Sequence, residues 1–474
     1  EAGLFESAVV MSPPDSREGN TDVDEATAPE VTKWWKDNVG SQDEQAYTKQ
    51  LIEQSVSQNN DKFVKIFKDI HQNPELGFME FRTAAIVAKE LKSYGYNTTE
   101  RIGKTGVAAV MKNGDGPIVM YRADMDANAV KETTGLPYAS NKIVKLDDGT
   151  ETPVAHTCGH DAHVAWMLGT AKFLAEHKDL WKGTVVFIGQ PAEEPILGAE
   201  AMVNDGLYKK YKIPEPDYLF GIHAAPVAVG VIAAATGVRM AGTDQFDVTF
   251  HGIGGHGSTP NLSKDPIVMA ATAITQYQTI ISRGIDPKNA AVITVGSIQA
   301  GSNNNVIPAS ALLKINLRWF NERDRKLMID GITRINESIA YAYNMPKDKY
   351  PTTEFKGWAH PLDNDVALTK VVQNALSTSG LIENPKYLLD ENVLPSVMGS
   401  EDVHHLVIHN EKNAYSYINV GIAEPQRFIE AFKQKKLPFN AHNGDFEIDL
   451  SAIPYGTKAG IFSMLAILNN PPKS

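Results

Sequence analysis

Hydrophobic positions follow an alternation of helix-like and strand-like patterns from about residue 62 onward. Phe81, Ala84, Ala88 and Leu91 recur at helical spacing, and this segment stops near Gly95. A second, largely apolar helix is expected over residues 162–175. Short apolar runs that predict buried strands lie at residues 106–111, 117–121, 184–189 and 217–222. Short strands separated by helices favour an α/β domain whose sheet is covered on both faces.

A different pattern begins near Ala241. Alternate residues are apolar over 246–250 and over 313–319, as in strands with one buried face. One helix is expected after Asp265-Pro266, because proline is favoured in a first turn, and another over residues 322–343. Strands predicted at residues 291–296 and 352–355 complete the order β-α-β-β-α-β, which is typical of a ferredoxin-like sandwich. We therefore predict one α/β domain in two parts, residues 61–240 and 357–474, interrupted by an inserted α+β domain at residues 241–356.

Composition and charge narrow the class of protein. The 474 residues are 42% hydrophobic and 22% charged, which is typical of a folded globular protein with an ample core. The formal net charge of -12 argues against nucleic acid or an anionic membrane as the main partner. No apolar run approaches the roughly 18 residues that a membrane-spanning helix needs.

Residues 1–60 are predicted to form an acidic N-terminal arm. Residues 1–30 contain eight acidic side chains and one basic one, with Pro13-Pro14 and few large apolar residues. This composition favours a flexible or surface-wrapped segment. The chain begins at Glu1 rather than at a methionine. A cleaved export signal would explain both this start and the acidic arm. We therefore expect a periplasmic or secreted protein, with the cytoplasm as the alternative.

The single cysteine, Cys158, lies in a segment rich in metal-binding side chains. His156, His160, Asp161 and His163 fall within the same eight residues. Cys158 and His160 are two residues apart, so from an extended backbone both point the same way and can reach one ion. A lone cysteine is more often a buried structural thiol, but these neighbours favour a metal ligand. A thiol-redox or cysteine-nucleophile enzyme is a further alternative.

Two further polar features end predicted strands. Glu193-Glu194 follow Gln190-Pro191-Ala192 after the strand at 184–189, and His223 follows the strand at 217–222. In open α/β sheets, ligands bind beyond the carboxyl ends of the strands, so these side chains can converge. Adjacent glutamates suit a division of labour, in which one binds metal and the other moves protons. A solvated acidic pair is the alternative interpretation of Glu193-Glu194.

These features form part of a series of short motifs that occurs in one known family. The chain resembles the M20 metallopeptidase clan, in the amidohydrolase branch that includes hippurate, N-acyl-amino-acid and indole-acetyl-amino-acid hydrolases. The resemblance spans about residues 62 to 465. The matching segments are His71–Leu76 with Glu80 and Thr83, Arg122–Ala127, His156–His163, Gln190–Glu194, Gly221–His223, Gly254–Gly257, Gly399–Asp402 and Ala441–Asn443. Each motif is weak alone, but their joint occurrence in this order is highly specific.

The resemblance implies a mixed-sheet α/β catalytic domain with an inserted ferredoxin-like lid and dimerisation domain. It implies two divalent metal ions per subunit, Zn, Mn, Co or Ni, since the residue types do not select one metal. It also implies a metal-bridging water that attacks the amide, with Glu193 as the general base and acid. The implied metal ligands are Cys158, His160, Glu194, His223 and His442.

Other residues are expected to support this centre or to hold the substrate. Asp124, Asp126 and His163 are expected to orient the ligands rather than to bind metal. In the resembled family, the histidine at the position of His256 stabilises the oxyanion, often in the partner subunit's site. On the predicted strand at 313–319, Arg318 suits a bidentate grip on a substrate carboxylate, and Asn305 in the preceding turn is a second candidate. A solvated side chain is the alternative for Arg318.

The chain departs from the family pattern in three places, all expected near the pocket. Pro195-Ile196 follow Glu-Glu where glycine is usual, Val403-His404-His405 replace a segment that begins with Phe, and residues 143–153 lengthen the connection into the Cys158 motif. We therefore expect a metal-dependent hydrolase of N-acyl amino acids or related conjugates with an atypical substrate preference. The substrate is a small molecule, and the enzyme is expected to be a homodimer through the lid. A dipeptidase of the same clan and a catalytically inactive binding protein are the alternatives.

Overall fold

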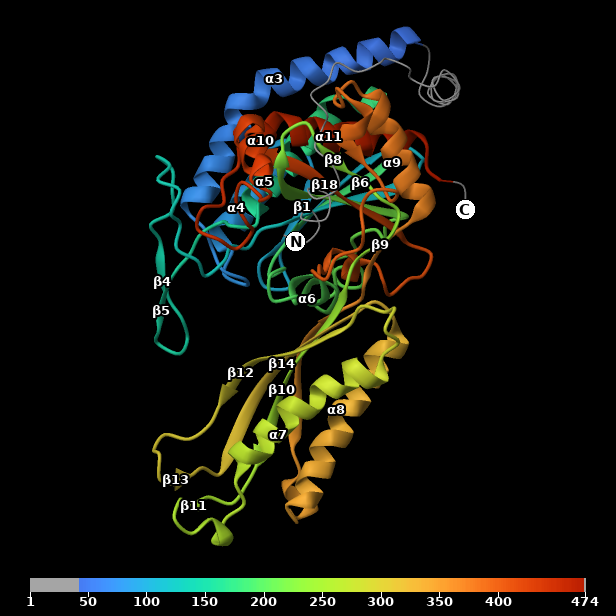
Figure 1. Cartoon of the computed structure of the whole chain (residues 1–474). Coiled ribbons are helices and arrows are strands. Elements are labelled where there is room, and N and C mark those ends of the chain that lie inside the picture. The colour runs from blue at the N-terminus through green and yellow to red at the C-terminus, as the bar shows by residue number, and fades with distance from the viewer. Residues whose placement is uncertain (1–41, 473–474) are drawn as a thin grey trace. The chain divides into compact units, whose positions relative to one another are not determined.

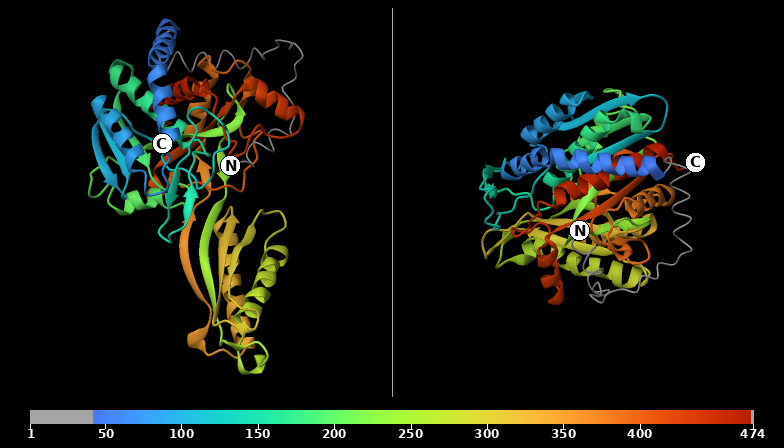
Figure 2. Two further views of the ribbon diagram at one scale, coloured as in Figure 1. Left: turned by 90° about the vertical axis from the view of Figure 1, so that its left-hand side faces the viewer. Right: turned by 90° about the horizontal axis from the view of Figure 1, so that it is seen from above.

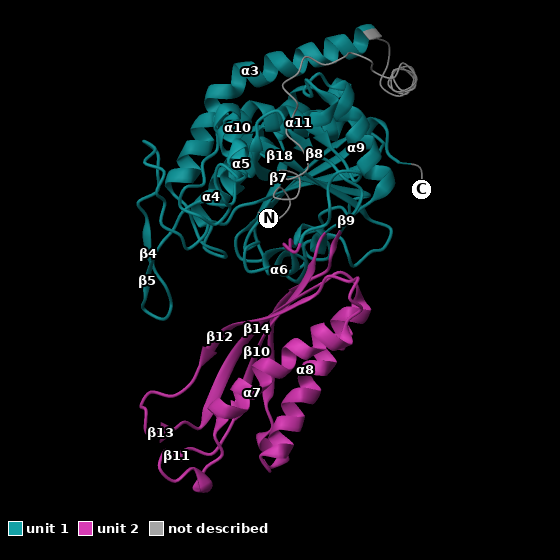
Figure 3. Cartoon of the chain, in the orientation of Figure 1, with its two compact units in different colours: residues 1–239, 363–397, 402–474 teal, residues 240–362, 398–401 magenta. Residues whose placement is uncertain are grey.

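The computed structural model describes residues 42–472. These residues form two compact units (Figure 3). The first contains residues 42–239, 363–397 and 402–472, and the second contains residues 240–362 and 398–401. The second unit therefore extends beyond the predicted insertion of 241–356. Strand β15 (Thr352–Ala359) runs past residue 355, and the Ala241 N–H donates to the Gly399 carbonyl within the same unit.

The first unit is built on a mixed eight-stranded sheet (Figure 1). The strand order is β1-β2-β6-β3-β7-β18-β8-β17, in which β6, β3, β7 and β18 are parallel neighbours. The longer strands are β1 (Asn97–Ile102), β2 (Gly106–Asn113), β3 (Ile118–Asp124), β6 (Gly183–Gln190), β7 (Tyr218–Ala228) and β18 (Ala414–Ala423). Strand β6 is buried throughout, as expected for a strand covered on both faces.

Helices cover this sheet. They are α3 (Gln42–Gln72), α4 (Phe81–Ser93), α5 (His160–Glu176), α6 (Gly198–Asn204), α9 (Val366–Thr378), α10 (Pro425–Lys433) and α11 (Ala452–Asn469). Helices α3, α5 and α11 pack against one another, and α5 also packs against β3 and β7 (Figure 1, Figure 2). Because α5 is enclosed by helices and sheet, nearly all of its residues are buried. This places the start of α5, which carries His160, inside the first unit.

The predicted N-terminal arm of 1–60 is too long. Helix α3 begins at Gln42, so residues 42–60 are helical. Ile52, Val56, Phe63 and Phe67 recur at helical spacing and are buried in the core of the first unit. This apolar stripe, rather than the acidic composition of the preceding segment, determines the structure here. Residues 1–41 of the predicted arm lie outside the described residues.

The second unit contains the predicted β-α-β-β-α-β order (Figure 3). Its elements are β10 (Gly242–His251), α7 (Pro266–Thr279), β12 (Val292–Gln299), β14 (Ser310–Trp319), α8 (Glu322–Ala342) and β15. The four strands are antiparallel in the order β12-β14-β10-β15. Both helices pack against β14, where Leu313, Ile315 and Leu317 are buried. The unit thus has a hydrophobic core of its own.

Several short strands complete the secondary structure. They are β4 (Ile143–Lys145), β5 (Glu151–Pro153), β8 (Ile232–Ala233), β9 (Gly237–Met240), β11 (Gly255–His256), β13 (Val306–Ile307), β16 (Leu362–Asn364) and β17 (Leu388–Leu389). Among residues 42–472, we find no helix that combines the length and the apolar character needed to cross a membrane.

Candidate metal centre

The candidate ligands come together at one edge of the sheet in the first unit. Strands β3 and β6 are parallel neighbours with Asp124 opposite Gln190, so Asp126 and the segment leading to Glu193 leave the sheet side by side. His223 is on β7, the other neighbour of β3. The prediction that His223 ends its strand was wrong, because β7 continues to Ala228. His223 is nevertheless buried, and its ring faces the Cys158 thiol.

Cys158 and His160 are joined by a tight turn. The expected extended backbone is not present, because Gly159 has a φ of 90° and His160 is the first residue of α5. A Cβ atom at position 159 would lie 2.5 Å from the Cβ of Ala224. Only glycine therefore combines this left-handed backbone with such a close approach to β7. The turn, rather than strand alternation, directs both side chains into the same space.

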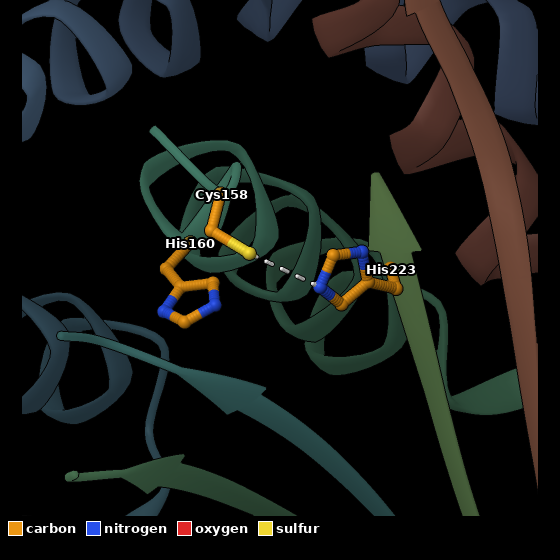
Figure 4. Close-up of side chains that lie close together, drawn as sticks. All are labelled: Cys158, His160 and His223. Carbon is orange, nitrogen blue, oxygen red and sulfur yellow. Dashed lines mark hydrogen bonds between the residues drawn. The ribbon is translucent and has the colours of Figure 1, made fainter. Parts of the chain in front are cut away.

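Cys158, His160 and His223 form the first candidate ligand group. One potential ligand atom from each lies within 4.8 Å of the others, and all three side chains are buried. The Cys158 Sγ is 3.7 Å from the His223 Nε2. In Figure 4 the thiol points toward the His223 ring, and the His160 ring lies beside it. Thiolate and imidazole are the ligands that zinc and similar transition metals prefer.

Cys158 also belongs to a second group, with Glu194 and His442. The Glu194 Oε1 is 3.5 Å from the His160 Nε2, and its Oε2 is 3.1 Å from the His442 Nε2. His442 is tied to the cysteine segment, since its backbone N–H donates to the Thr157 carbonyl over 2.7 Å. The five side chains predicted as ligands therefore lie together in the structure, as two groups that share the thiol.

Hydrogen bonds to the backbone orient both buried imidazoles. The Nδ1 of His160 lies 2.6 Å from the Asp126 carbonyl, and the Nδ1 of His223 lies 2.7 Å from the Ala224 carbonyl. Each Nδ1 therefore donates its hydrogen to a backbone carbonyl, and each ring keeps its Nε2 on the side away from that carbonyl. Such outer hydrogen bonds are typical of metal-binding histidines.

Polar atoms around this space lack hydrogen-bond partners. In the part of the chain that the structure describes, no hydrogen bond is found for the His160 Nε2, Asp124 Oδ2, Asp126 Oδ1 or Glu194 Oε1, although all four atoms are buried. The Asp124 Oδ2 does lie within ion-pair distance of the His160 Nε2, at 3.2 Å, and of the Arg122 guanidinium, at 3.3 Å. Buried polar atoms without partners are costly unless another group satisfies them. A cation bound among imidazole, thiolate and carboxylate atoms would satisfy them, so the residues present fit divalent metal ions.

Asp124 and His163 lie next to the candidate ligands and form a further group of potential ligands with His160. The His163 Nε2 accepts the Ala224 N–H over 2.8 Å, so its Nδ1–H donates to Asp124 over 2.6 Å. Both ring nitrogens of His163 are thus engaged. Burial lowers the pKa of His163 to about 4, against the opposing charge of Asp124. His163 therefore stays neutral and secures β7 beside His223.

Arg122 balances the buried charge of Asp124. Burial would raise the pKa of Asp124, but the charges of His160 and Arg122 outweigh it and hold that pKa well below its ordinary value. The fully buried guanidinium also donates to Gln190 over 2.7 Å and to Asp402 over 3.1 Å. From the sequence, Arg122 is recognisable only as part of a motif, because spacing along the chain does not indicate which carboxylates it meets.

The segment that carries Glu193 is held by two other carboxyl groups. The Glu194 N–H donates to the Asp126 Oδ2 over 2.9 Å, and the Ala192 N–H donates to the Glu80 Oε2 over 2.7 Å. Glu80 is fully buried. Burial and the negative charge of Asp126 raise the pKa of Glu80 to about 8. The sequence alone indicates no role for Glu80, and its only signal is its place in a family motif.

A buried ion network lies beside the start of α5. The His71 Nδ1 is 2.7 Å from the Asp161 Oδ2, and its Nε2 is 2.8 Å from the Glu132 Oε1. Burial lowers the pKa of His71, but hydrogen bonds and charges from Asp161 and Glu132 outweigh it and raise the pKa to about 10. The charged imidazole thus joins the end of α3, the segment after β3 and the start of α5. The sequence does not pair these residues, since they are distant in the chain.

His256, Asn305 and Arg318 belong to the second unit. The His256 Nδ1 accepts the Ser258 N–H over 3.0 Å, which leaves the other ring nitrogen as an N–H donor. Asn305 is exposed. The Arg318 guanidinium donates to Asn316 over 2.8 Å and to Ser400 over 2.7 Å. The roles assigned to these three residues stay predictions.

The departures from the family pattern have definite structures. Ile196 is buried with a φ of 59°, a backbone conformation that β-branched residues rarely adopt. Residues 143–153 contain the hairpin of β4 and β5. Residues Val403–Leu406 form a buried 3₁₀-helix that includes His404 and His405.

Comparisons with known proteins identify relatives of this chain. The sequence pattern of peptidase family M20/M25/M40 matches residues 120–458. The chain is 42% identical over 283 residues to the hippurate hydrolase of Campylobacter jejuni subsp. jejuni, which covers 59% of this chain and 70% of that protein. It is 31% identical over 416 residues to the IAA-amino acid hydrolase ILR1-like 2 of Arabidopsis thaliana, which covers 86% of this chain and 85% of that protein.

Solved structures show the same relationship. The Bacillus subtilis YXEP protein, a dinuclear metal binding peptidase from the M20 family, is similar with a TM-score of 0.65 and 26% identity, over 87% of this chain and 99% of that one. The family predicted from the sequence motifs is thereby confirmed. The chain belongs to peptidase family M20/M25/M40 and is a hydrolytic enzyme.

Proposed function

We propose that this enzyme hydrolyses the amide bond of N-acyl amino acids or related amino-acid conjugates, using two bound divalent metal ions. The observation that carries this proposal is the convergence of Cys158, His160, Glu194, His223 and His442, with Glu193 adjacent to one of them in the chain. The names of the relatives support the substrate class, since hippurate hydrolase and IAA-amino acid hydrolase are both named for amino-acid conjugates.

The five side chains would hold the metal ions as two groups that share the Cys158 thiolate. Bound divalent ions supply positive charge that polarises an amide carbonyl and lowers the pKa of a bound water. The likeness to a dinuclear metal binding peptidase of Bacillus subtilis supports two ions. The described residues contain five groups of potential ligands, and two of these groups share Cys158. The ions are Zn, Mn, Co or Ni, since thiolate, imidazole and carboxylate ligands do not select one of these metals.

Glu193 is the general base and acid in this proposal. Its side chain is buried, its Oε2 lies 3.9 Å from the His160 Nε2, and it forms a group of potential ligands with Asp126 and His160. Glu193 accepts a proton from the attacking water as the water adds to the amide carbon. It then passes the proton to the amine as the carbon–nitrogen bond breaks. The adjacent Glu194 cannot share this task, because both of its oxygens face histidine ligands.

His256, Arg318 and Asn305 complete the proposal for the substrate. Because the His256 Nδ1 accepts a backbone N–H, the Nε2–H can donate to the negative oxygen that develops on the carbonyl. Arg318 and Asn305 are proposed to bind the substrate carboxylate. We also propose that the enzyme is a homodimer through residues 240–362 and that it acts in the periplasm or outside the cell.

The test is a hydrolysis screen on protein loaded separately with Zn, Mn, Co or Ni. N-acetyl and N-benzoyl amino acids are expected to be cleaved, and the corresponding unblocked dipeptides are not. Glu193→Gln should lower kcat by about 10²- to 10⁴-fold, because general acid–base catalysis contributes an amount of that size. Its metal content should equal that of the wild type. Glu176→Gln, at the opposite end of α5 from His160, is the control and should keep full activity.

Each rival function has its own result in this screen. Preference for dipeptides with a free amine would assign the dipeptidase function instead. Cleavage of neither class with any of the four metals would contradict the substrate assignment and favour a binding protein. Activity that survives chelation but is lost on thiol alkylation would make Cys158 a nucleophile. Full activity of Glu193→Gln would remove Glu193 from its role.

A further inference from the structure

The segment that carries Glu193 has an unusual backbone. Ala192 and Ile196 have φ values of 48° and 59°, so two residues with side chains adopt the left-handed conformation on either side of Glu193-Glu194. Such conformations persist only where the surroundings enforce them. The direction of the Glu193 side chain therefore depends on the contacts that hold this segment, residues 191–196.

Two buried carboxyl groups supply those contacts from outside the segment. Glu80 accepts the Ala192 N–H, and Asp126 accepts the Glu194 N–H, over 2.7 and 2.9 Å. These N–H groups belong to the residues immediately before and after Glu193. Asp126 also accepts a hydrogen bond from the His160 ring through its carbonyl. Among the described residues, Glu80 makes no such contact with a candidate ligand. Its connection to the candidate metal centre is its hydrogen bond with the Ala192 N–H.

Glu80 is itself tightly placed. Its side chain is fully buried, and its Oε1 accepts the Thr105 hydroxyl over 2.9 Å while its Oε2 accepts the Ala192 N–H. On the same side, a Cβ at Gly77 would come within 3.2 Å of the Ala192 Cβ. Just beyond the segment, a Cβ at Gly198 would lie 1.5 Å from the Pro191 carbonyl oxygen. The segment is thus enclosed, and Glu80 fixes its first peptide.

A purely structural role for Glu80 at the start of α4 is not what the contacts indicate. Glu80 immediately precedes this helix, but within residues 42–472 its side chain makes no capping hydrogen bond. That task falls to Glu75, which accepts the Arg82 N–H over 2.9 Å and the Thr83 N–H over 2.6 Å. The Glu80 side chain instead reaches a segment more than a hundred residues away in the chain.

We propose that Glu80 is a positioning residue that sets the orientation of Glu193 by holding the Ala192 peptide, with Thr105 fixing the Glu80 carboxyl in turn. The inference rests on the proposed role of Glu193 as the general base. A displacement of a catalytic group by about 1 Å can cost 10²-fold in rate, so loss of this contact should reduce turnover while the substrate still binds.

The test compares Glu80→Ala with Glu80→Gln in the full-length, metal-loaded enzyme. Glu80→Ala should lower kcat by about 10- to 100-fold, with KM within about threefold of wild type and with unchanged metal content. Glu80→Gln should recover most of kcat, because its amide can accept the Ala192 N–H and donate to the Thr105 oxygen. Burial and the charge of Asp126 raise the pKa of Glu80 to about 8, so the neutral glutamine is also an electrostatic match near neutral pH.

A second measurement does not depend on catalysis. Hydrogen–deuterium exchange of the metal-free protein should be faster in peptides covering residues 191–196 for Glu80→Ala, and close to wild type for Glu80→Gln. Glu75→Ala is the matched control, since it removes the cap of α4 without touching this segment. It should leave exchange at 191–196 and kcat near wild type. If Glu80→Ala does not fold, Thr105→Val should show the same changes to a smaller degree.

Two results would overturn the role of Glu80. One is exchange and kcat in Glu80→Ala that match those of Glu75→Ala. The other is a Glu80→Gln enzyme as slow as Glu80→Ala, which would assign the effect to charge rather than to positioning. Failure of the proposed function is distinguishable, because an active Glu193→Gln enzyme would reject the general base while the exchange data still report on the Ala192 contact.

Discussion

At the scale of single residues, the turn at Gly159 decides whether the candidate ligands meet. We expect Gly159→Ala to destabilise the metal-free protein by about 1–3 kcal/mol, because the new Cβ would lie 2.5 Å from Ala224 on a backbone with φ of 90°. The same change should lower the metal content, since it separates Cys158 from His223. Urea denaturation and elemental analysis of the purified variant measure the two effects.

The chain offers a matched control for Gly159. Gly149 has a similar φ of 86°, but a Cβ there would meet nothing within 4 Å. Gly149→Ala therefore introduces the backbone strain without the steric clash. It should lower the free energy of unfolding by about 1 kcal/mol and leave the metal content unchanged. Equal stability and equal metal content in the two variants would show that the close approach to Ala224 does not hold the ligand turn.

The sequence could predict the members of the centre but not all of the geometry that unites them. Cys158 and His160 were expected to converge from an extended backbone, whereas a left-handed glycine at the start of a helix brings them together. Glu80 and Arg122 could be recognised as parts of motifs, yet their partners could not. A buried charge pairs with groups that the fold brings close, and spacing along the chain carries no such information.

At the scale of elements, His71 links the end of α3 to the start of α5 and to the segment containing Glu132. Its pKa is about 10 in the folded protein, above the ordinary value of 6.5. The stabilisation from the charged ring is therefore complete below about pH 6.5 and is lost as the pH rises through 10. For the metal-free protein, we expect the free energy of unfolding of the wild type to exceed that of His71→Gln by a few kcal/mol near pH 6.5.

The difference in free energy of unfolding between the wild type and His71→Gln should narrow steadily between pH 6.5 and 10. Urea denaturation at each pH measures this difference. The ionisation of Asp161 and Glu132 does not contribute to this pH dependence. Burial opposes their ionisation, but the hydrogen bond and charge of His71 help to hold both of their pKa values below the ordinary range. Both carboxylates therefore stay ionised throughout this window. A pH-independent difference between the two proteins would show that His71 acts only through packing.

Periodicity predicted the elements that have one buried stripe. Helix α8 was expected over residues 322–343 and runs from Glu322 to Ala342, because its apolar residues recur on one face. Periodicity does not predict the end of an element correctly where a polar functional residue interrupts its apolar pattern. Strand β7 was predicted to stop before His223, since a histidine breaks an apolar run. His223 is buried beside the Cys158 thiol. This contact joins residues that are distant in the chain, so the local pattern of apolar residues does not indicate it.

At the scale of the whole molecule, the two units differ in how the chain builds them. Residues 240–362 are continuous and contain a core of their own, so we expect this fragment to fold alone and to melt cooperatively. The fragment lacks Met398 and Ser400, to which Arg318 donates hydrogen bonds. Their loss should lower the free energy of unfolding by about 1–3 kcal/mol. Circular dichroism during heating tests this, with Leu313→Asp as an unfolded control because Leu313 is buried in β14.

The first unit should behave in the opposite way. Its sheet requires β18, which pairs with β7 along most of its length, and its second ligand group requires His442. Both lie in the C-terminal part of the chain, so a fragment of residues 42–239 leaves the edge of β7 unpaired and apolar surface exposed. We expect no cooperative transition and no stoichiometric metal binding from that fragment. A cooperative melt of 42–239, or the absence of one for 240–362, would contradict this division of the chain.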